Sequence, residues 1–228
     1  MFKDRRDAGE QLAEALTIYK DRNPLVLAIP RGGVVVGYHV ARHLQCDFSI
    51  ISVRKLPLPD NPEAGFGAIA EDGSTYFDNR ALKALPAKMV EQIIEEQKLE
   101  IKQRIEVLRN GKSLPVMTDR IVILVDDGIA MGSTMRAAIM LCKNNNPTKI
   151  IVAVPVAGVS AYAEFEELVD RVVILEKPQF FRAVAQVYEN WYDLSDEEAI
   201  RILEKADNYL PTTKTSDQQN IHEKKFNM

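Results

Sequence analysis

The sequence of 228 residues predicts an α/β fold with a mainly parallel sheet flanked by helices. The run Ile121–Val125 contains only β-branched residues and leucine, which is typical of a strand buried on both faces of a parallel sheet. Further short apolar runs alternate with helical patterns, as in successive strand–helix–strand units. Hydrophobic residues make up 46% of the chain, enough for a sizeable core. We expect one main domain over residues 1–205 and a disordered tail over residues 211–228.

The first part of the chain is expected to alternate between helix and strand. The elements are Asp4–Tyr19, Leu25–Ile29, Val34–Leu44 and Phe48–Val53. Proline and glycine are frequent from Leu56 to Gly73, and this composition predicts a loop. Two short strands are expected around it, Phe66–Ala70 and Ser74–Phe77, joined by a turn at residues 71–73.

A long helix is predicted over Pro86–Arg109 because apolar residues recur along one of its faces. That apolar stripe is expected to pack on the chain's own sheet, and a homodimer contact is the alternative. The later elements are expected to complete the parallel sheet and to end in a helix opened by the capping box Ser195–Glu198. They are Ile121–Val125, a helix to Cys142, Lys149–Pro155, Ala161–Leu168, Val172–Leu175 and a last helix to Lys205.

Composition narrows the class of protein. The net charge of −4 and the pI of about 5.5 give no sign of general attraction to nucleic acid or membranes. No apolar run approaches transmembrane length, and no signal peptide is expected. Cys46 and Cys142 lie far apart in the sequence and have no metal-binding or redox spacing. We therefore expect reduced core cysteines in a cytoplasmic protein.

An acidic pair and a small-residue loop follow the apolar strand at residues 121–125. Asp126 and Asp127 come first, and the loop ends in Gly132-Ser133-Thr134, where a helix begins with Ser133 or Thr134 expected as N-cap. The N–H groups of such a loop and helix start converge on a point that suits a phosphate. The carboxylates repel phosphate, so they are expected to face sugar hydroxyls or hydrated Mg²⁺. The alternative is a capped helix with solvated aspartates, which is disfavoured because carboxylates beside a buried strand need partners.

Two basic segments follow the first two expected strands. Pro30-Arg31-Gly32-Gly33 comes after the first strand, and its glycines let N–H groups and a guanidinium approach an anion closely. Arg54-Lys55 is expected at the carboxyl end of the second strand, where open α/β sheets bind ligands. Each segment alone is a weak signal, because Gly-Gly turns and charged strand ends are common.

The run from Ile121 to Thr134 resembles the phosphoribosyl-pyrophosphate motif of type I phosphoribosyltransferases, in which an apolar strand and two acidic residues precede a loop ending Thr-Gly-Gly-Thr. The chain departs from that pattern with Met131 in place of the first threonine and Ser133 in place of the second glycine. With the two basic segments and residues 181–198, the resemblance covers about residues 1–205. It implies the type I fold, with a lid hairpin over about residues 56–78 and a small hood over about residues 176–205.

The resemblance also implies site roles. The ribose and its 5′-phosphate would be bound by Asp126, Asp127, Gly128, Ile129, Ala130, Met131, Gly132, Ser133 and Thr134. The pyrophosphate would be bound by Arg31, Gly32, Gly33, Arg54 and Lys55, with Lys55 favoured over Arg54. Catalytic contributions are expected from Arg31, Lys55, Asp126 and Asp127, and the two aspartates would hold Mg²⁺ through water.

The implied activity is Mg²⁺-dependent transfer of a 5-phosphoribosyl group from phosphoribosyl pyrophosphate to an unidentified planar nitrogenous acceptor, with release of pyrophosphate. Phe180 and Phe181 are expected to stack on that acceptor, and the alternative is that they pin their segment to the sheet. A protein that senses phosphoribosyl pyrophosphate and regulates RNA or DNA is the alternative function. The acidic pI and the lack of a basic stripe count against nucleic acid as a partner.

Overall fold

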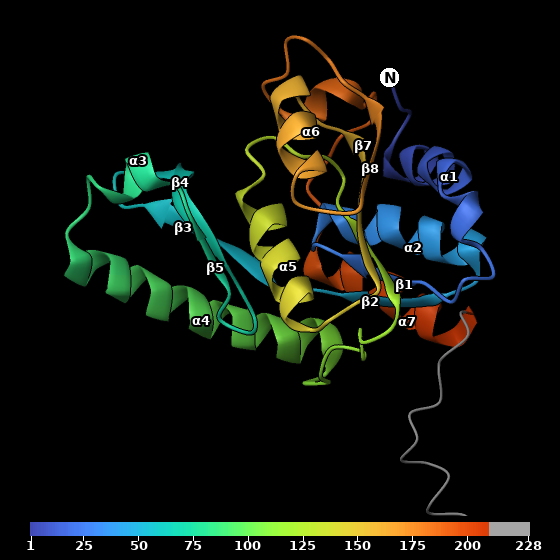
Figure 1. Cartoon of the computed structure of the whole chain (residues 1–228), viewed down its shortest axis with the longest axis horizontal. Helices are drawn as coiled ribbons and strands as arrows, with labels where there is room; N and C mark the ends of the chain where they lie inside the picture. The colour runs from blue at the N-terminus through green and yellow to red at the C-terminus, as the bar shows by residue number, and fades with distance from the viewer. Residues whose placement is uncertain (210–228) are drawn as a thin grey trace, which may run out of the picture.

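The computed structural model describes residues 1–209, and its centre is a five-stranded parallel sheet. The strand order is β2-β1-β6-β7-β8, and every neighbouring pair is parallel (Figure 1). The strands are β1 (Leu25–Ala28), β2 (Asp47–Ile50), β6 (Ile121–Val125), β7 (Lys149–Val156) and β8 (Arg171–Glu176). The expectation of a mainly parallel sheet is confirmed.

Helices cover both faces of this sheet. Figure 1 shows α1 (Arg5–Ala15) and α2 (Gly32–Leu44) on one side, with α5 (Ser133–Asn144) and α6 (Val159–Glu166) on the other. In β6, Ile123 and Val125 pack with α1 and α2, whereas Val122 and Leu124 pack with α5. Because side chains alternate between the faces of a strand, the unbroken apolar run supplies both cores at once.

A second, antiparallel sheet lies beside α5. It consists of β3 (Val53–Leu58), β4 (Asn61–Ala70) and β5 (Thr75–Phe77), in that order. The expected turn at residues 71–73 joins β4 to β5. The expected single strand Phe48–Val53 was wrong: the chain leaves the parallel sheet after Ile50, and the backbone N–H of Ser52 donates to the Glu71 carboxylate instead.

The expected loop around the prolines is also corrected, because it forms most of β3 and β4. Pro57 lies on the edge strand β3, where a missing N–H costs no ladder bond on the outer side. Pro62 lies at the start of β4, beyond the residues that pair with β5. Both positions are ones that β-sheets tolerate, and the region expected to form a lid hairpin therefore has three strands.

The long helix α4 (Ala87–Arg109) packs on this second sheet, as its apolar stripe predicts. Ile93 and Ile101 contact a cluster that includes Phe66 of β4, and the short helix α3 (Asn79–Leu82) closes one end of it. Arg109 ends α4 and forms a buried bidentate ion pair with Glu71, at 2.7 and 3.0 Å. The stripe is thus used within the chain, and a homodimer stays a prediction.

The C-terminal segment crosses back over the parallel sheet. It contains the 3-10 turn η2 (Val184–Val187) and α7 (Asp196–Tyr209). The expected capping box is confirmed, since Ser195 and Glu198 exchange hydrogen bonds of 3.0 and 3.2 Å. A further 3-10 turn, η1 (Thr17–Tyr19), extends α1. The expected tail over residues 211–228 lies outside the described residues, and within them no helix is long and apolar enough to cross a membrane.

Candidate active site

Two loops meet at the carboxyl ends of adjacent strands. β1 and β6 pair in parallel, with Ala28 opposite Val125, and the Ile29 N–H donates to the Val125 carbonyl at 2.8 Å. The loop 30–33 and the loop 126–132 therefore begin side by side. This edge of an open α/β sheet is where such folds bind ligands.

The two loops are in van der Waals contact, and glycine is required for it. A Cβ at Gly32 would lie 1.8 Å from Asp127 Oδ2, and a Cβ at Gly33 would lie 3.0 Å from the Asp126 Cα. The two glycines were predicted to let an anion approach closely. In the structure they let the acidic pair of the neighbouring loop pack against the backbone. The peptide bond between Pro30 and Arg31, just before them, is cis.

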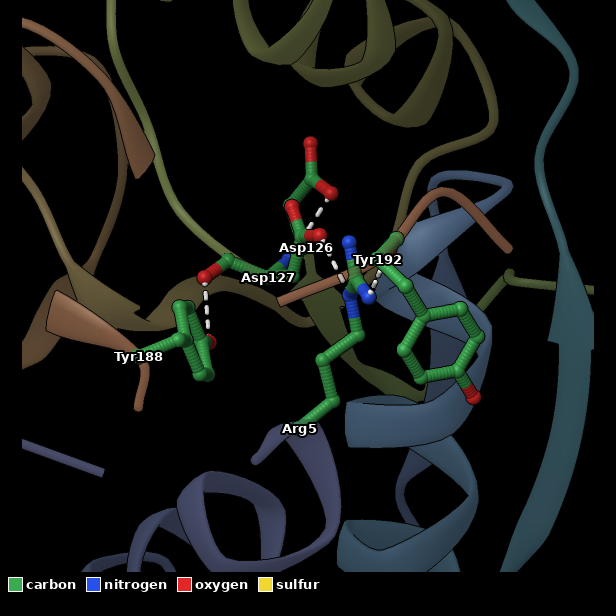
Figure 2. Close-up of polar contacts among 5 residues, drawn as sticks. All are labelled: Arg5, Asp126, Asp127, Tyr188 and Tyr192. Carbon is green, nitrogen blue, oxygen red and sulfur yellow. Dashed lines mark hydrogen bonds and ion pairs between the residues drawn. The ribbon is translucent and has the colours of Figure 1, made fainter. Parts of the chain in front are cut away.

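The two aspartates point in different directions (Figure 2). Asp126 Oδ1 accepts the N–H of Asp127 at 2.8 Å, while Asp127 Oδ2 accepts Nε of Arg5 at 2.8 Å. Burial raises the pKa of Asp126 well above its ordinary value, and the Asp127 charge raises it further. Burial also raises the pKa of Asp127, and Arg5 opposes that shift. Arg5 was missed by the sequence reasoning, since nothing near it in the chain connects it with residue 127.

A cavity of about 520 Å³ lies over the second loop. Asp126 and Lys55 both line it, together with Val184 of the C-terminal segment. Its other lining residues are Ala64, Gly65, Gly128, Ile129, Ala130, Met131, Gly132, Ser133 and Thr134. The fold thus brings three predicted parts of the site together at one cavity: Lys55, one carboxylate of the acidic pair, and the small-residue loop. Asp127, Arg31, Gly32, Gly33, Arg54, Phe180 and Phe181 do not line this cavity.

The start of α5 differs from expectation. Gly132 is the N-cap, with φ +78°, and Ser133 is already the first helical residue, so the expected side-chain cap at Ser133 or Thr134 was wrong. Positive φ favours glycine, and a Cβ at Gly132 would also lie 2.8 Å from Arg136 Nη1. The helix start is left without a side-chain acceptor, and its N–H groups border the cavity.

Arg136 holds the loop before α5 in place. Its Nη1 donates to the Met131 carbonyl at 2.9 Å, and its guanidinium lies 5.0 Å from the Tyr76 ring centroid and 5.1 Å from that of Phe165. It also forms an ion pair with Glu164 of α6. Sequence reasoning missed Arg136, although its place in the first turns of the helix after the loop was a usable signal.

The two adjacent cations of β3 lie on opposite faces of the second sheet. Lys55 faces the cavity, whereas Arg54 hydrogen-bonds Gln97 of α4 at 3.2 Å and lies 3.8 Å from Glu100. The expected place at the end of a parallel strand was wrong for both, because β3 belongs to the antiparallel sheet. Lys55 therefore reaches the site from the side.

Arg31 and the two phenylalanines lie outside the cavity lining. Arg31 Nη1 is 3.8 Å from Asp196 Oδ1 of α7, and both side chains are 42% exposed. Phe180 is 89% exposed, and Phe181 packs against an apolar cluster that includes Val187 and Tyr188. Their roles toward pyrophosphate and acceptor stay predictions.

The donor groups of the site suit Mg²⁺ bound through water. Among residues 1–209 no group of three or more His, Cys, Asp and Glu residues could enclose a metal ion. Mg²⁺ commonly keeps several waters and uses one or two carboxylates with substrate phosphates. Asp126 at the cavity, with Asp127 behind it, offers such a set.

Comparisons with known proteins identify the family. The phosphoribosyl transferase domain family matches residues 3–190. The chain belongs to this family. Two Mycobacterium tuberculosis proteins, from strains CDC 1551 and H37Rv and both provisionally named phosphoribosyl transferases, are each 38% identical over 208 residues, 90% of this chain and 47% of theirs. The chain thus spans about half their length.

A solved structure supports the fold. The protein TT1426 from Thermus thermophilus is 36% identical and superimposes with a TM-score of 0.76, covering 92% of this chain and 99% of that one. The expected type I phosphoribosyltransferase fold, with its parallel sheet flanked by helices, is confirmed.

Proposed function

We propose that the chain is an Mg²⁺-dependent phosphoribosyltransferase that moves a 5-phosphoribosyl group from phosphoribosyl pyrophosphate to a planar nitrogenous acceptor. The observation that carries this proposal is the cavity lined by the loop 128–134, Asp126 and Lys55. A phosphate-binding loop, a carboxylate and a cation are what a ligand with a phosphate, a sugar diol and a pyrophosphate requires.

In this proposal the 5′-phosphate lies on the N–H groups of the loop and of the α5 N-terminus, which carries positive partial charge. Asp126 accepts hydrogen bonds from the ribose hydroxyls. Lys55 and Arg31, with the Gly32-Gly33 backbone, bind the pyrophosphate, and Arg54 contributes more weakly because it faces α4.

Displacement of pyrophosphate from C1 of the ribose builds positive charge on the sugar and negative charge on the leaving group. The chain's part is to hold both phosphate ends, to place cations at the leaving group, and to exclude water from the reactive sugar. Mg²⁺, when bound, would neutralise part of the pyrophosphate charge. The second sheet contributes Lys55, Ala64 and Gly65 to the cavity lining and the C-terminal segment contributes Val184, so these two parts are suited to exclude water.

Pyrophosphate release tests the proposal directly. The intact protein is incubated with phosphoribosyl pyrophosphate and Mg²⁺, and with each member of a panel of purines, pyrimidines and small amines. Acceptor-dependent release that is lost in Asp126→Asn supports the transferase. Tight ligand binding with no release for any acceptor would favour a sensing role, and absence of binding would contradict both.

A further inference from the structure

A buried arginine joins three distant parts of the chain at the acidic pair. Arg5, in the first turn of α1, is only 6% exposed. Its Nε donates to Asp127 Oδ2 at 2.8 Å, and its Nη1 donates to the Tyr192 carbonyl at 2.7 Å. Its guanidinium carbon also lies 3.9 Å from the Trp191 ring centroid, within the range of a cation–π contact.

Asp127 is bound to the same C-terminal segment a second time. The Tyr188 hydroxyl donates to the Asp127 backbone carbonyl at 2.7 Å (Figure 2). The Tyr188 ring is buried and packs against Trp191, with 5.3 Å between ring centroids. Asp127 is therefore linked to both ends of the stretch 188–192, to Tyr188 directly and to Tyr192 through Arg5.

Asp126 has none of these contacts. Its side chain lines the cavity and points away from Arg5 (Figure 2). The Asp127 carboxylate lies instead against the Cα of Gly32, outside the cavity lining. The two neighbouring side chains thus have different partners: Asp127 Oδ2 accepts from Arg5, whereas Asp126 Oδ1 accepts the Asp127 N–H and its side chain lines the cavity.

Charge favours the same division. A strongly anionic ligand is repelled by every carboxylate near it. Arg5 offsets the negative charge of Asp127 in a side chain that is only 14% exposed. Asp126 is the member of the pair that lines the cavity, where hydroxyl groups or a hydrated cation can meet it.

We propose that the two aspartates have separate functions: Asp126 faces the ligand, and Asp127 with Arg5 forms a clasp that fixes residues 188–192 beside the site. Only the ligand role of Asp126 rests on the proposed function. The clasp is a property of the protein alone, and it makes Arg5 a positioning residue for the C-terminal segment.

Fluorescence of Trp191 tests the clasp without any ligand, because it is the only tryptophan in the chain. We expect Arg5→Met and Asp127→Asn to shift its emission to longer wavelength and to increase quenching by iodide. Arg5→Lys, which keeps the charge, should restore part of the wild-type spectrum. Asp126→Asn should leave the spectrum unchanged, as should Arg6→Met, the matched control on the exposed face of α1, where Arg6 pairs with Glu10.

Hydrogen exchange of the same variants locates the change. Amides of residues 184–195 should exchange faster in Arg5→Met and Asp127→Asn than in Asp126→Asn. Tyr188→Phe, which removes one hydrogen bond, serves if either variant fails to fold by circular dichroism. Equal effects of Asp126→Asn and Asp127→Asn on these amides and on Trp191 emission would overturn the clasp.

Calorimetry with phosphoribosyl pyrophosphate and Mg²⁺ tests the other half of the division. Asp126→Asn should weaken affinity at least tenfold more than Asp127→Asn does. Equal weakening would overturn the separation of functions. If the wild-type protein does not bind this ligand, the proposed function fails, while the fluorescence and exchange results still decide whether the clasp exists.

Discussion

At the scale of single residues, the site depends on the fit between a glycine and a carboxylate. The volume that a side chain at residue 32 would occupy is filled by Asp127 Oδ2. Arg5 Nε, which would itself lie 3.0 Å from a Cβ at residue 32, donates to the same oxygen at 2.8 Å. Gly32 and Arg5 together therefore fix the position of the Asp127 carboxylate before any ligand binds. A substitution at either residue should displace the acidic pair.

Gly32→Ala should destabilise the protein by about 1–3 kcal/mol, the usual cost of forcing atoms into a packed site. Urea unfolding measures the loss. Gly158→Ala is the matched control, because the nearest atom to its Cβ would be Phe181 Cδ1 at 3.7 Å. If Gly32→Ala proves as stable as the control, Asp127 can move aside without cost, and the close fit between Gly32 and Asp127 does not contribute to stability.

Lys55 and Arg54 allow a comparison of neighbours on opposite faces of one strand. Lys55→Met should weaken binding of phosphoribosyl pyrophosphate about tenfold, or 1.4 kcal/mol, because Lys55 lines the cavity and the variant removes its positive charge. Arg54→Met should weaken binding less, and both variants should keep wild-type affinity for ribose 5-phosphate, which lacks the pyrophosphate. Calorimetry measures all four affinities, and a larger effect of Arg54→Met would reverse the assignment.

Sequence reasoning could name this pair but could not separate its members by geometry. Which of two adjacent side chains faces the site depends on strand register, here Lys55 opposite Ala68. Arg5 was beyond reach for a different reason, because it meets Asp127 across 122 positions of sequence. The loop 126–134 was within reach, because all its parts are contiguous.

At the scale of elements, the hydrophobic pattern of the sequence predicted those helices and strands whose formation depends mainly on their own residues. β6 and α4 were found correctly, because an unbroken apolar run and a long apolar stripe need no knowledge of partners. β3 and the first half of β4 were missed because their prolines suggested a loop. Their strand conformation depends on pairing with each other and on α4 behind them. Tertiary contacts thus outweighed composition there.

The ion pair between Glu71 and Arg109 anchors this second sheet to the first. Arg109 Nη1 also donates to the Ile50 carbonyl at the end of β2, at 3.1 Å. Arg109→Met leaves the Glu71 carboxylate buried and unpaired, so we expect a loss of about 3–5 kcal/mol in unfolding free energy. Arg6→Met breaks the exposed pair with Glu10, which water screens, and should cost far less. Similar losses in the two variants, measured by urea unfolding, would show that the buried pair is not an anchor.

At the scale of the whole molecule, the cavity is assembled from three parts. The parallel sheet supplies Asp126 and the following loop, the second sheet supplies Lys55 and Gly65, and the C-terminal segment supplies Val184. A ligand that contacts all three ties them together only in the folded state. Binding should therefore raise global stability, by an amount set by ligand concentration and affinity.

The final prediction uses that linkage to test Mg²⁺. With phosphoribosyl pyrophosphate at 100 times its Kd, stability should rise by about 2.7 kcal/mol, which corresponds to a Tm increase of roughly 5–10 °C for a chain of this size. Removal of Mg²⁺ with EDTA should abolish most of that increase in stability. Without Mg²⁺, no metal ion lies between the negative charge of the pyrophosphate and the Asp126 carboxylate. The smaller increase given by ribose 5-phosphate should be insensitive to EDTA, since loop N–H groups carry its phosphate. Scanning calorimetry with both ligands decides the point: an increase with phosphoribosyl pyrophosphate that survives EDTA would mean that Lys55 and Arg31 neutralise the pyrophosphate without a metal.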